Sequence, residues 1–317
     1  MNENPLVTFA VLAFNQEKYI REAVNGALSQ TYRPLEVIIS DDCSVDNTFK
    51  IIREIISEYD GVHEVIVRQN QDNQGLIQHV NYITSIMKGE ILVMAAGDDI
   101  SIPNRTNTLV SKFVDNPKAQ LVHSEVTEIA EDGDVVSRGV PPLGTKYEIE
   151  NLTRSTGLYI GATGAIRKVL PKYFGPITYK NTYEDQIYGF RAALIGEIEF
   201  IEEELVKYRL DVGISSSSLN YLIGIKERRK YLAHRIETFM QRKLDLDKSK
   251  HPKFDNLNEI IIHEITLASA RSELYDENLH FWCKFLSLSF RTYFNALLIE
   301  GRYLIKLVLS KFKKIFI

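Results

Sequence analysis

Residues 7–48 read VTFAVLAFNQEKYIREAVNGALSQTYRPLEVIISDDCSVDNT. Val7–Phe14 is a continuous apolar run, which is typical of a strand covered on both faces. The following residues repeat apolar side chains at helical spacing up to Leu28, and we expect Asn15 to cap that helix. Leu35–Ile39 is a second apolar run. A strand, a helix and a second strand in this order predict a right-handed crossover between two parallel strands.

The alternation of strand and helix continues to about residue 125. The further strands that we expect are Glu64–Val67, Ile91–Ala95 and Gln120–His123, and the further helices are 46–56, Leu76–Met87 and 104–116. The pattern weakens over 126–160. Beyond it we expect the helices Arg167–Phe174 and Glu184–Leu194 and the short strands Glu199–Ile201 and Leu205–Tyr208. The sequence therefore predicts an α/β fold, with a mostly parallel sheet flanked by helices.

Composition restricts the class of protein further. The 317 residues carry a net charge of -4, which gives no indication of a nucleic-acid partner. The two cysteines, Cys43 and Cys283, form no CxxC pattern, which excludes a cysteine zinc site and favours a reducing compartment. The N-terminus lacks the features of a signal peptide, and no apolar stretch is long enough to span a membrane. We expect a cytoplasmic location.

Two acidic pairs follow predicted strands directly, and they mark the expected site. Asp41-Asp42 ends the second strand and Asp98-Asp99 follows the fourth. In a parallel sheet, ligands bind at the carboxyl ends of the strands. Asp98-Asp99 offers oxygen ligands for a divalent cation, and Asp41-Asp42 offers acceptors for ribose or a base. Helix capping accounts for part of each motif, but the shared edge favours a binding site.

Other candidate residues carry two interpretations each. Gly75 opens a helix and either brings backbone close to a nucleotide or joins two helix caps. Arg68 either reaches a phosphate or is a solvated arginine at a strand end. Glu184-Asp185 begins a helix, where the dipole favours acids, and one of the two could instead be a general base. Arg191, on the same helix, is either the buried partner of an acid or a surface charge.

Several enzyme classes lack their motifs here. Ala13-Phe14-Asn15-Gln16 stands where a dinucleotide enzyme has GxGxxG, and Walker A, HExxH and GxSxG sequences are absent. A nucleotidyltransferase on a similar sheet remains an alternative, although it would need a glycine-rich, basic first loop. A non-catalytic glycan- or nucleotide-binding module is a second alternative.

Over residues 5–212 the chain resembles the inverting family-2 glycosyltransferases of the GT-A fold that act in bacterial polysaccharide assembly. The quoted opening stretch, with its Gln-Thr-Tyr turn and acidic strand end, carries most of this resemblance. After the serine run Ser215–Ser218 the sequence becomes helical and rich in charges, so we expect a boundary near Gly213–Asn220, with a catalytic domain over 1–212 and a helical region over 213–317. The resemblance implies a UDP-sugar or related donor, Mg²⁺ or Mn²⁺, and a saccharide or lipid-linked acceptor for an O-antigen or capsule.

The resemblance also assigns roles to residues. The nucleobase and ribose would be framed by Ala13, Asn15 and Asp41 or Asp42, and the helix from Gly75 to Asn81 matches the family. Asp98-Asp99 matches the DxD-type motif, with Asp99 as metal ligand and Asp98 facing ribose or metal. Ala96 replaces a common further aspartate, so Asp211 is a candidate third ligand. Asp185 matches the catalytic base, with Glu184 beside it and Arg191 downstream, and Arg209 matches a late phosphate-binding motif, near which Ser215 and Ser216 are candidate phosphate donors.

The C-terminal segment 285–317 combines apolar and basic residues. From Cys283 onward the chain carries a net charge of +6, against -10 for the rest. Two interpretations fit this composition equally well. The segment is either an amphipathic helix pair that lies on an anionic membrane surface, or a helix that packs on the core or forms a homodimer interface.

Overall fold

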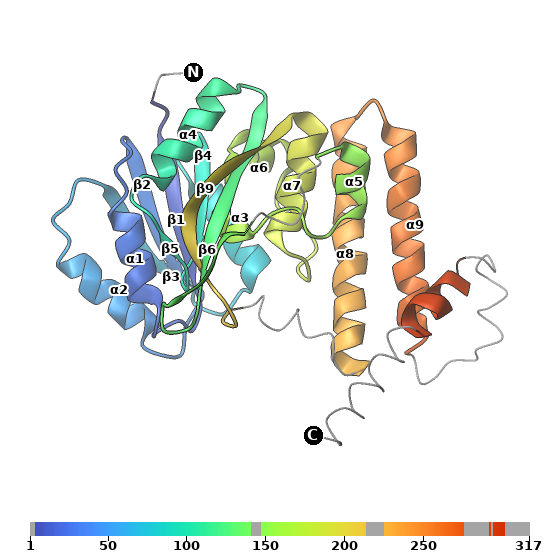
Figure 1. Cartoon of the computed structure of the whole chain (residues 1–317), viewed down its shortest axis with the longest axis horizontal. Helices are drawn as coiled ribbons and strands as arrows, with labels where there is room; N and C mark the ends of the chain where they lie inside the picture. The colour runs from blue at the N-terminus through green and yellow to red at the C-terminus, as the bar shows by residue number, and fades with distance from the viewer. Residues whose placement is uncertain (1–3, 141–146, 214–224, 276–291, 293, 302–317) are drawn as a thin grey trace.

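A nine-stranded mixed sheet forms the middle layer of the molecule, with helices on both faces (Figure 1). The computed structural model describes residues 4–140, 147–213, 225–275, 292 and 294–301. The strands are β1 (Val7–Ala13), β2 (Leu35–Asp41), β3 (Glu64–Gln69), β4 (Ile91–Ala96), β5 (Ile100–Ser101), β6 (Ala119–Ile129), β7 (Val135–Val140), β8 (Ala165–Arg167) and β9 (Glu197–Arg209). The helices are α1 (Ile20–Leu28), α2 (Thr48–Ser57), α3 (Leu76–Ile86), α4 (Arg105–Asp115), α5 (Ile149–Arg154), η1 (Gly161–Thr163), α6 (Val169–Phe174), α7 (Glu184–Ile195), α8 (Ile225–Ser249) and α9 (Phe254–Glu273).

The first four strands in sequence are parallel throughout, in the order β3-β2-β1-β4. Ala13 pairs with Asp41 and Leu12 pairs with Ala96, so β1, β2 and β4 end at the same edge. This register brings both acidic pairs to that edge, as the alternation of strands and helices predicts. The prediction of an α/β fold with helices on both faces is confirmed.

The second half of the sheet is mixed. β8 runs antiparallel between β4 and β6, while β6 and β9 are parallel and β5 joins β9 antiparallel. β6 extends to Ile129 and turns into β7, so the weak pattern after residue 126 conceals a hairpin. The prediction of two short strands at Glu199–Ile201 and Leu205–Tyr208 is wrong, because β9 is one continuous strand. Its glutamates mask the apolar alternation from which a single strand would be recognised.

The helix after β1 begins later than expected. It starts at Ile20, so Asn15 is not its N-cap, and Asn15 adopts a left-handed backbone conformation with φ of 52°. Its side-chain oxygen instead accepts a hydrogen bond from the backbone N–H of Val45 at 2.9 Å. Asn15 therefore ties the β1–α1 loop to the β2–α2 loop at the carboxyl edge of the parallel strands.

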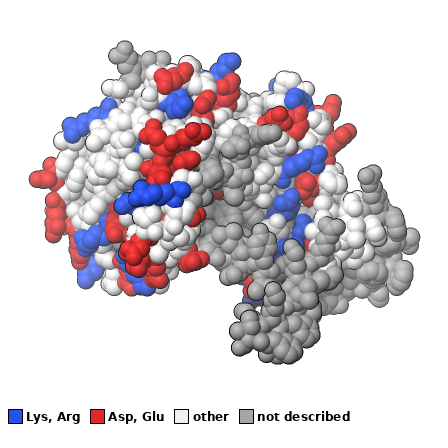
Figure 2. Space-filling view, in the orientation of Figure 1, with Lys and Arg blue, Asp and Glu red and all other residues white. Residues whose placement is uncertain are grey.

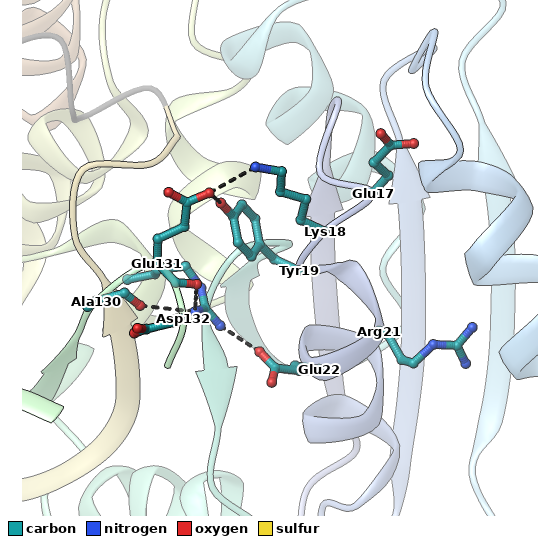
Figure 3. Close-up of a pocket in the computed structure, with 9 residues that line it drawn as sticks. Glu17, Lys18, Tyr19, Arg21, Glu22, Ala130, Glu131 and Asp132 are labelled. Carbon is teal, nitrogen blue, oxygen red and sulfur yellow. Dashed lines mark hydrogen bonds and ion pairs between the residues drawn. The ribbon is translucent and has the colours of Figure 1, made fainter. Parts of the chain in front are cut away.

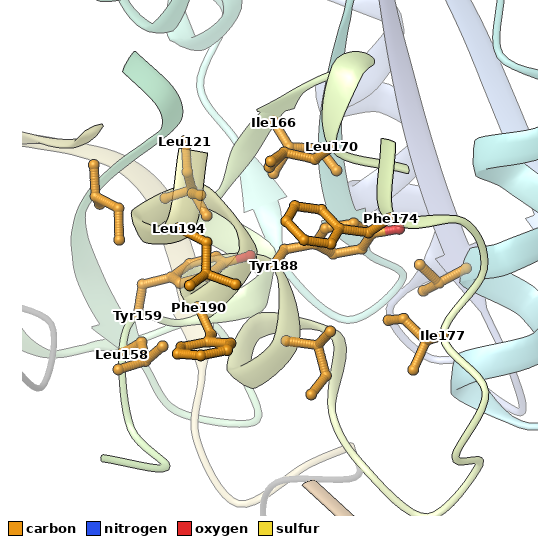
Figure 4. Packing of buried hydrophobic residues seen from close by; sticks show 14 of the residues in the cluster. Leu121, Leu158, Tyr159, Ile166, Leu170, Phe174, Ile177, Tyr188, Phe190 and Leu194 are labelled. Carbon is orange, nitrogen blue, oxygen red and sulfur yellow. The ribbon is translucent and has the colours of Figure 1, made fainter. Parts of the chain in front are cut away.

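Alternate residues of the strands feed two hydrophobic clusters on opposite faces of the sheet. The cluster packed against α1, α2 and α4 includes Phe9, Val37 and Val93. The other contains the neighbouring residues Ala10 and Ile38, with side chains from α3, α6 and α7 (Figure 4). This second cluster also takes in residues of the C-terminal helices, namely Phe239, Leu246, Leu257, Ile260 and Ile261. Helices α8 and α9 are therefore continuous with the core on that face.

The end of the described chain is anchored on α8 and α9 by one buried acid. Glu300 is 1% exposed and accepts hydrogen bonds from Arg228, Arg271 and Tyr275. Most of 285–317, together with the boundary expected near 213–220, lies outside the described residues, so the division into two domains and the role of the tail stay predictions. In the parts described, none of the helices combines the length and apolarity that a membrane crossing requires.

In Figure 2 acidic side chains gather on the half of the molecule that holds the sheet, with basic side chains among and around them. β9 accounts for five glutamates of the sequence, at positions 197, 199, 202, 203 and 204.

Candidate active site

The Asp98-Asp99 turn follows β4 directly and is held by contacts from two other segments, the β1–α1 loop and the end of β9. One carboxylate oxygen of Asp99 accepts the backbone N–H of Arg209 at 2.9 Å, and Asp98 accepts a side-chain hydrogen bond from Gln16. Asp98 is 8% exposed and Asp99 is 4% exposed. A Cβ at Gly97, between strand and pair, would displace the Gln16 amide that bonds Asp98. The acids therefore sit in a tight, preformed turn.

The two carboxylates are electrostatically unfavourable as they stand. Burial raises the pKa of Asp98, and burial together with the Asp98 charge raises the pKa of Asp99 well above its usual value. The charges of Arg105 and Arg209 oppose this shift only in part. A divalent cation would relieve the repulsion that remains, and magnesium is commonly held by one or two carboxylates together with substrate phosphates.

Asp211 was the expected third metal ligand. It lies on the chain just after β9, in a left-handed conformation with φ of 58°, and its side chain is exposed. The same segment returns to the pair at Gly213, where a Cβ would collide with a carboxylate oxygen of Asp98. No three acidic, histidine or cysteine side chains in the described ranges gather at metal-binding distance. The donor set thus fits a site of two carboxylates that substrate oxygens would complete.

Arg209 supports the turn and has little capacity left for a ligand. Its guanidinium donates to the carbonyls of Asp98 (3.1 Å), Ala130 (3.1 Å) and Glu131 (2.7 Å), and it pairs with Glu22 at 2.5 Å. It also lines an open hollow of about 760 Å³ between the start of α1 and the β6–β7 turn (Figure 3). Lys18 and Tyr19 close one side of this hollow through hydrogen bonds to Glu131. The phosphate contact expected of Arg209 stays a prediction.

Asp41 and Asp42 both organise loops at the strand edge. Asp41 is fully buried and accepts hydrogen bonds from the backbone and hydroxyl of Ser44 and from Gln69. Asp42 receives the backbone N–H of Gln74 and of Gly75, each at 2.9 Å. The Ala13 carbonyl in turn accepts the backbone N–H of Asp42 at 2.8 Å. The residues predicted to frame a nucleobase are therefore brought together.

Arg68 and Gly75 occupy the outer side of this group. Arg68 donates to Ser40 and Asn70, and its guanidinium lies 3.9 Å from the centre of the Tyr82 ring, so it is not a free surface charge. Gly75 has a positive φ of 75° and open space around it, which suits a close backbone approach by a ligand. Asn81, from the expected Gly-to-Asn helix, is used instead to hold the backbone of Ile177.

Arg105 is a site residue that sequence reasoning missed. It is fully buried, donates to the carbonyls of Met94 (2.8 Å) and Ala162 (2.6 Å), and burial lowers its pKa to about 9 while Asp99 opposes that change. It thereby joins β4, the strand that leads into the Asp98-Asp99 turn, to η1. The available signal was an arginine in the first turn of a helix, where the dipole disfavours a cation.

Glu184 and Asp185 begin α7 beside η1, on the other side of Arg105. A Cβ at Gly161 would collide with a carboxylate oxygen of Glu184, so the absence of a side chain there makes room for the acid. Burial raises the pKa of Glu184, and burial together with the Glu184 charge raises the pKa of Asp185 well above its usual value. Both acids are only partly exposed. Such a carboxylate suits proton transfer near neutral pH.

Arg191 lies further along α7 and is buried, which decides between its two interpretations. It forms a two-pronged pair with Asp245 of α8, at 2.8 and 3.0 Å, and donates to the carbonyl of Gly175 at 2.9 Å. The pair fixes α7 against α8.

The N-terminal part of the chain matches a known protein family. "Glycosyl transferase family 2" matches residues 8–174, more than half of the chain. Among curated relatives, "Uncharacterized protein Rv1520" of Mycobacterium tuberculosis is 31% identical over 62% of this chain and 57% of its own length. The hyaluronan synthase of Pasteurella multocida is 27% identical over 44% of this chain and 14% of its own. The chain thus spans little more than half the length of the mycobacterial relative.

Solved structures share the fold at low identity. S. aureus TarS 1-349 in complex with UDP-GlcNAc aligns with a TM-score of 0.59 at 18% identity, covering 94% of this chain and 80% of that one. The mannosyltransferase PcManGT of Pyrobaculum calidifontis, in complex with GDP-Man and Mn²⁺, aligns with a TM-score of 0.57 at 17% identity, covering 98% of this chain and 89% of that one. With the matched segment holding both acidic strand ends on this sheet, the chain belongs to glycosyltransferase family 2 and is a glycosyltransferase.

Proposed function

We propose that this enzyme moves a sugar from a nucleoside diphosphate donor, most simply a UDP-sugar, to a hydroxyl of a glycan or lipid-linked saccharide. The observation that carries the proposal is the link between the two acidic pairs. Arg105 donates to the carbonyls of Met94 in β4 and Ala162 in η1, its charge favours the ionised form of Asp99, and the adjoining Gly161 makes room for Glu184. These contacts join the segment of Asp98-Asp99 to that of Glu184-Asp185. Sugar transfer requires the donor site and the base to be close to each other in this way.

The donor side is assigned to the sheet edge. Asp98 and Asp99 would hold Mg²⁺ or Mn²⁺, with Asp211 as a further candidate, and the ion would neutralise charge on the departing diphosphate. Asp41, Asp42, Ala13 and Asn15 would surround the nucleoside. Support comes from the nucleotide-sugar complexes of the two similar structures, one of which contains Mn²⁺.

The acceptor side is assigned to the start of α7. Asp185 takes the proton of the acceptor hydroxyl while the oxygen attacks the anomeric carbon. The bond from that carbon to the diphosphate oxygen breaks with its electron pair, so the configuration inverts and the nucleoside diphosphate leaves. The raised pKa of Asp185 makes it a stronger base than an exposed carboxylate, which favours this role over a purely capping one.

The biological setting proposed is the synthesis of a cell-surface polysaccharide, at the inner face of the membrane. Its support is the likeness to a hyaluronan synthase, together with the basic, apolar composition of 285–317.

A donor screen tests the assignment directly. Release of nucleoside diphosphate is measured with UDP-, GDP- and dTDP-sugars, each with Mn²⁺, with Mg²⁺ and with a chelator. We expect one donor to be turned over, more slowly with the chelator, and Asp185→Asn to lower kcat by at least about a hundredfold. Asp72→Asn, an exposed loop acid, is the matched control and should behave as the parent enzyme.

Four outcomes would count against parts of the proposal. Full activity of Asp185→Asn would show that Asp185 is not the catalytic base. Turnover that is insensitive to the chelator would show that Asp98 and Asp99 do not act through a bound metal ion. Nucleotide-sugar binding without turnover for any acceptor would favour a binding module, and pyrophosphate release from a nucleoside triphosphate would favour a nucleotidyltransferase.

A further inference from the structure

Three side chains of α8 contact Gln186 in the first turn of α7. His234 and Thr238 bind its side-chain oxygen, whereas Arg242, which is fully buried, binds its backbone carbonyl. The Nε and one terminal nitrogen of Arg242 donate to the carbonyl of Gln186, at 3.3 and 2.8 Å. Gln186 directly follows Asp185, and its backbone N–H donates to the Asp185 carboxylate at 2.6 Å. The guanidinium therefore fixes the peptide units that determine where this carboxylate lies.

The other terminal nitrogen of Arg242 holds a second segment. It donates to the carbonyls of Leu152, Thr153 and Ser155, at 3.1, 3.1 and 2.7 Å. These carbonyls belong to the last turn of α5 and to its C-cap, where a cation is favoured by the helix dipole. From there the chain leads to Tyr159 and to Gly161, which lies against Glu184. One side chain thus joins both backbone segments beside the acids.

Within the described residues, the Arg242 guanidinium hydrogen-bonds only to neutral backbone carbonyls and to no acidic side chain. A buried cation in this setting is costly. Burial lowers the pKa of Arg242 to about 9, and Arg235 adds to that decrease. Asp185 is foremost among the acids that favour the charged guanidinium, and Arg242 in turn lowers the pKa of Asp185.

The other titratable groups around Asp185 do not offer a positive charge. Glu184 stands on its own helix, Tyr183 is the N-cap residue, and Tyr159 comes from the segment before η1. The ring of His234 of α8 lies tilted against that of Tyr183, with ring centres 4.4 Å apart. Burial lowers the pKa of His234 to about 4, so this side chain is neutral at pH 7.

We propose that Arg242 is a positioning residue for sugar transfer, which holds the backbone around Asp185 in place and sets a positive charge near its carboxylate. It does so from α8, beyond the residues 8–174 that the family match covers. The inference rests on the proposed function, because it takes Asp185 as the base.

Arg242→Met and Arg242→Lys test it, with donor KM, kcat and the pH dependence of kcat as readouts. Arg242→Met should lower kcat by about ten- to a hundredfold, because misplacing a reacting group is expensive. It should also move the acidic limb of the kcat profile to higher pH, while donor KM stays near that of the parent. Arg242→Lys keeps the charge and loses the two-pronged contact, so kcat should fall while the acidic limb stays in place.

Arg235→Met is the matched control, since it removes an arginine of α8 that pairs with Glu264 of α9 and forms no hydrogen bond or ion pair with α7 in the described part of the chain. Its kcat should stay within about threefold of the parent. A folded Arg242→Met with unchanged kcat and unchanged acidic limb would overturn the inference. If the Met variant does not fold, Arg242→Lys decides, because unchanged kcat there would show that the geometry of the fork is not needed. Full activity of Asp185→Asn would instead overturn the proposed base, whatever the Arg242 variants do.

Discussion

The buried pair Arg191–Asp245 permits a quantitative test of whether α8 folds as one unit with the sheet. Arg191 is fully buried and Asp245 is 2% exposed, and two hydrogen bonds join them at 2.8 and 3.0 Å. Removing one partner leaves the other as an uncompensated buried charge. Arg191→Met should therefore lower the free energy of unfolding by about 3–5 kcal/mol.

The double variant Arg191→Met/Asp245→Leu should be less destabilised than Arg191→Met alone. Replacing both charges by apolar groups removes the desolvation cost as well as the attraction. What remains is the cost of two groups that lose a partner, the Gly175 carbonyl and the Gln241 amide, at about 1–3 kcal/mol for each group that stays buried. Arg191→Met alone already includes the Gly175 loss.

Urea unfolding, followed by circular dichroism, gives the free energy of unfolding of the parent protein, of each single variant (Arg191→Met and Asp245→Leu) and of the double variant. The coupling energy comes from the four values of the cycle. Additive effects of the two single substitutions would refute the reasoning. A split transition, with the helical region unfolding separately while the sheet persists, would show that α8 is not integral to the core.

Three further substitutions follow from single contacts. Burial lowers the pKa of His123 to about 3, so the folded state favours the neutral ring and stability falls as pH decreases from about 6.5 toward 3, by about 1.4 kcal/mol per pH unit. His123→Phe should flatten the measured dependence of unfolding free energy on pH by that slope between pH 4 and 6, and equal slopes would contradict the assignment. Gly89→Ala places a Cβ against the backbone of Thr8, so we expect a loss of about 1–3 kcal/mol in thermal or urea unfolding, with unchanged kcat for the folded enzyme. Gly161→Ala pushes only on the movable end of Glu184, so kcat should fall about tenfold with little change in stability, and an unchanged kcat would separate Glu184 from the reaction.

Much of the site could be placed from sequence because its position depends on strand ends. Apolar runs identify β1, β2 and β4, and a parallel arrangement then brings Asp41-Asp42 and Asp98-Asp99 to one edge. The start of α7 was also predictable, since its helical pattern begins at Glu184. The partners of these acids were not, because hydrogen bonds between residues far apart in the chain leave no periodic trace. Arg105 and Arg242 illustrate this, since each reaches a backbone carbonyl more than fifty positions away.

The sequence by itself determined the parallel half of the sheet, the helices that flank it and the edge at which the acids gather. Hydrophobic periodicity is a local property and it survives in any tertiary context. Only the tertiary structure decided that β9 is continuous, that Asn15 joins two loops, that Arg209 is consumed in holding the acidic turn, and that Arg191 is buried against Asp245. These outcomes depend on which polar groups burial forces together, and that selection is made by the packing of distant segments.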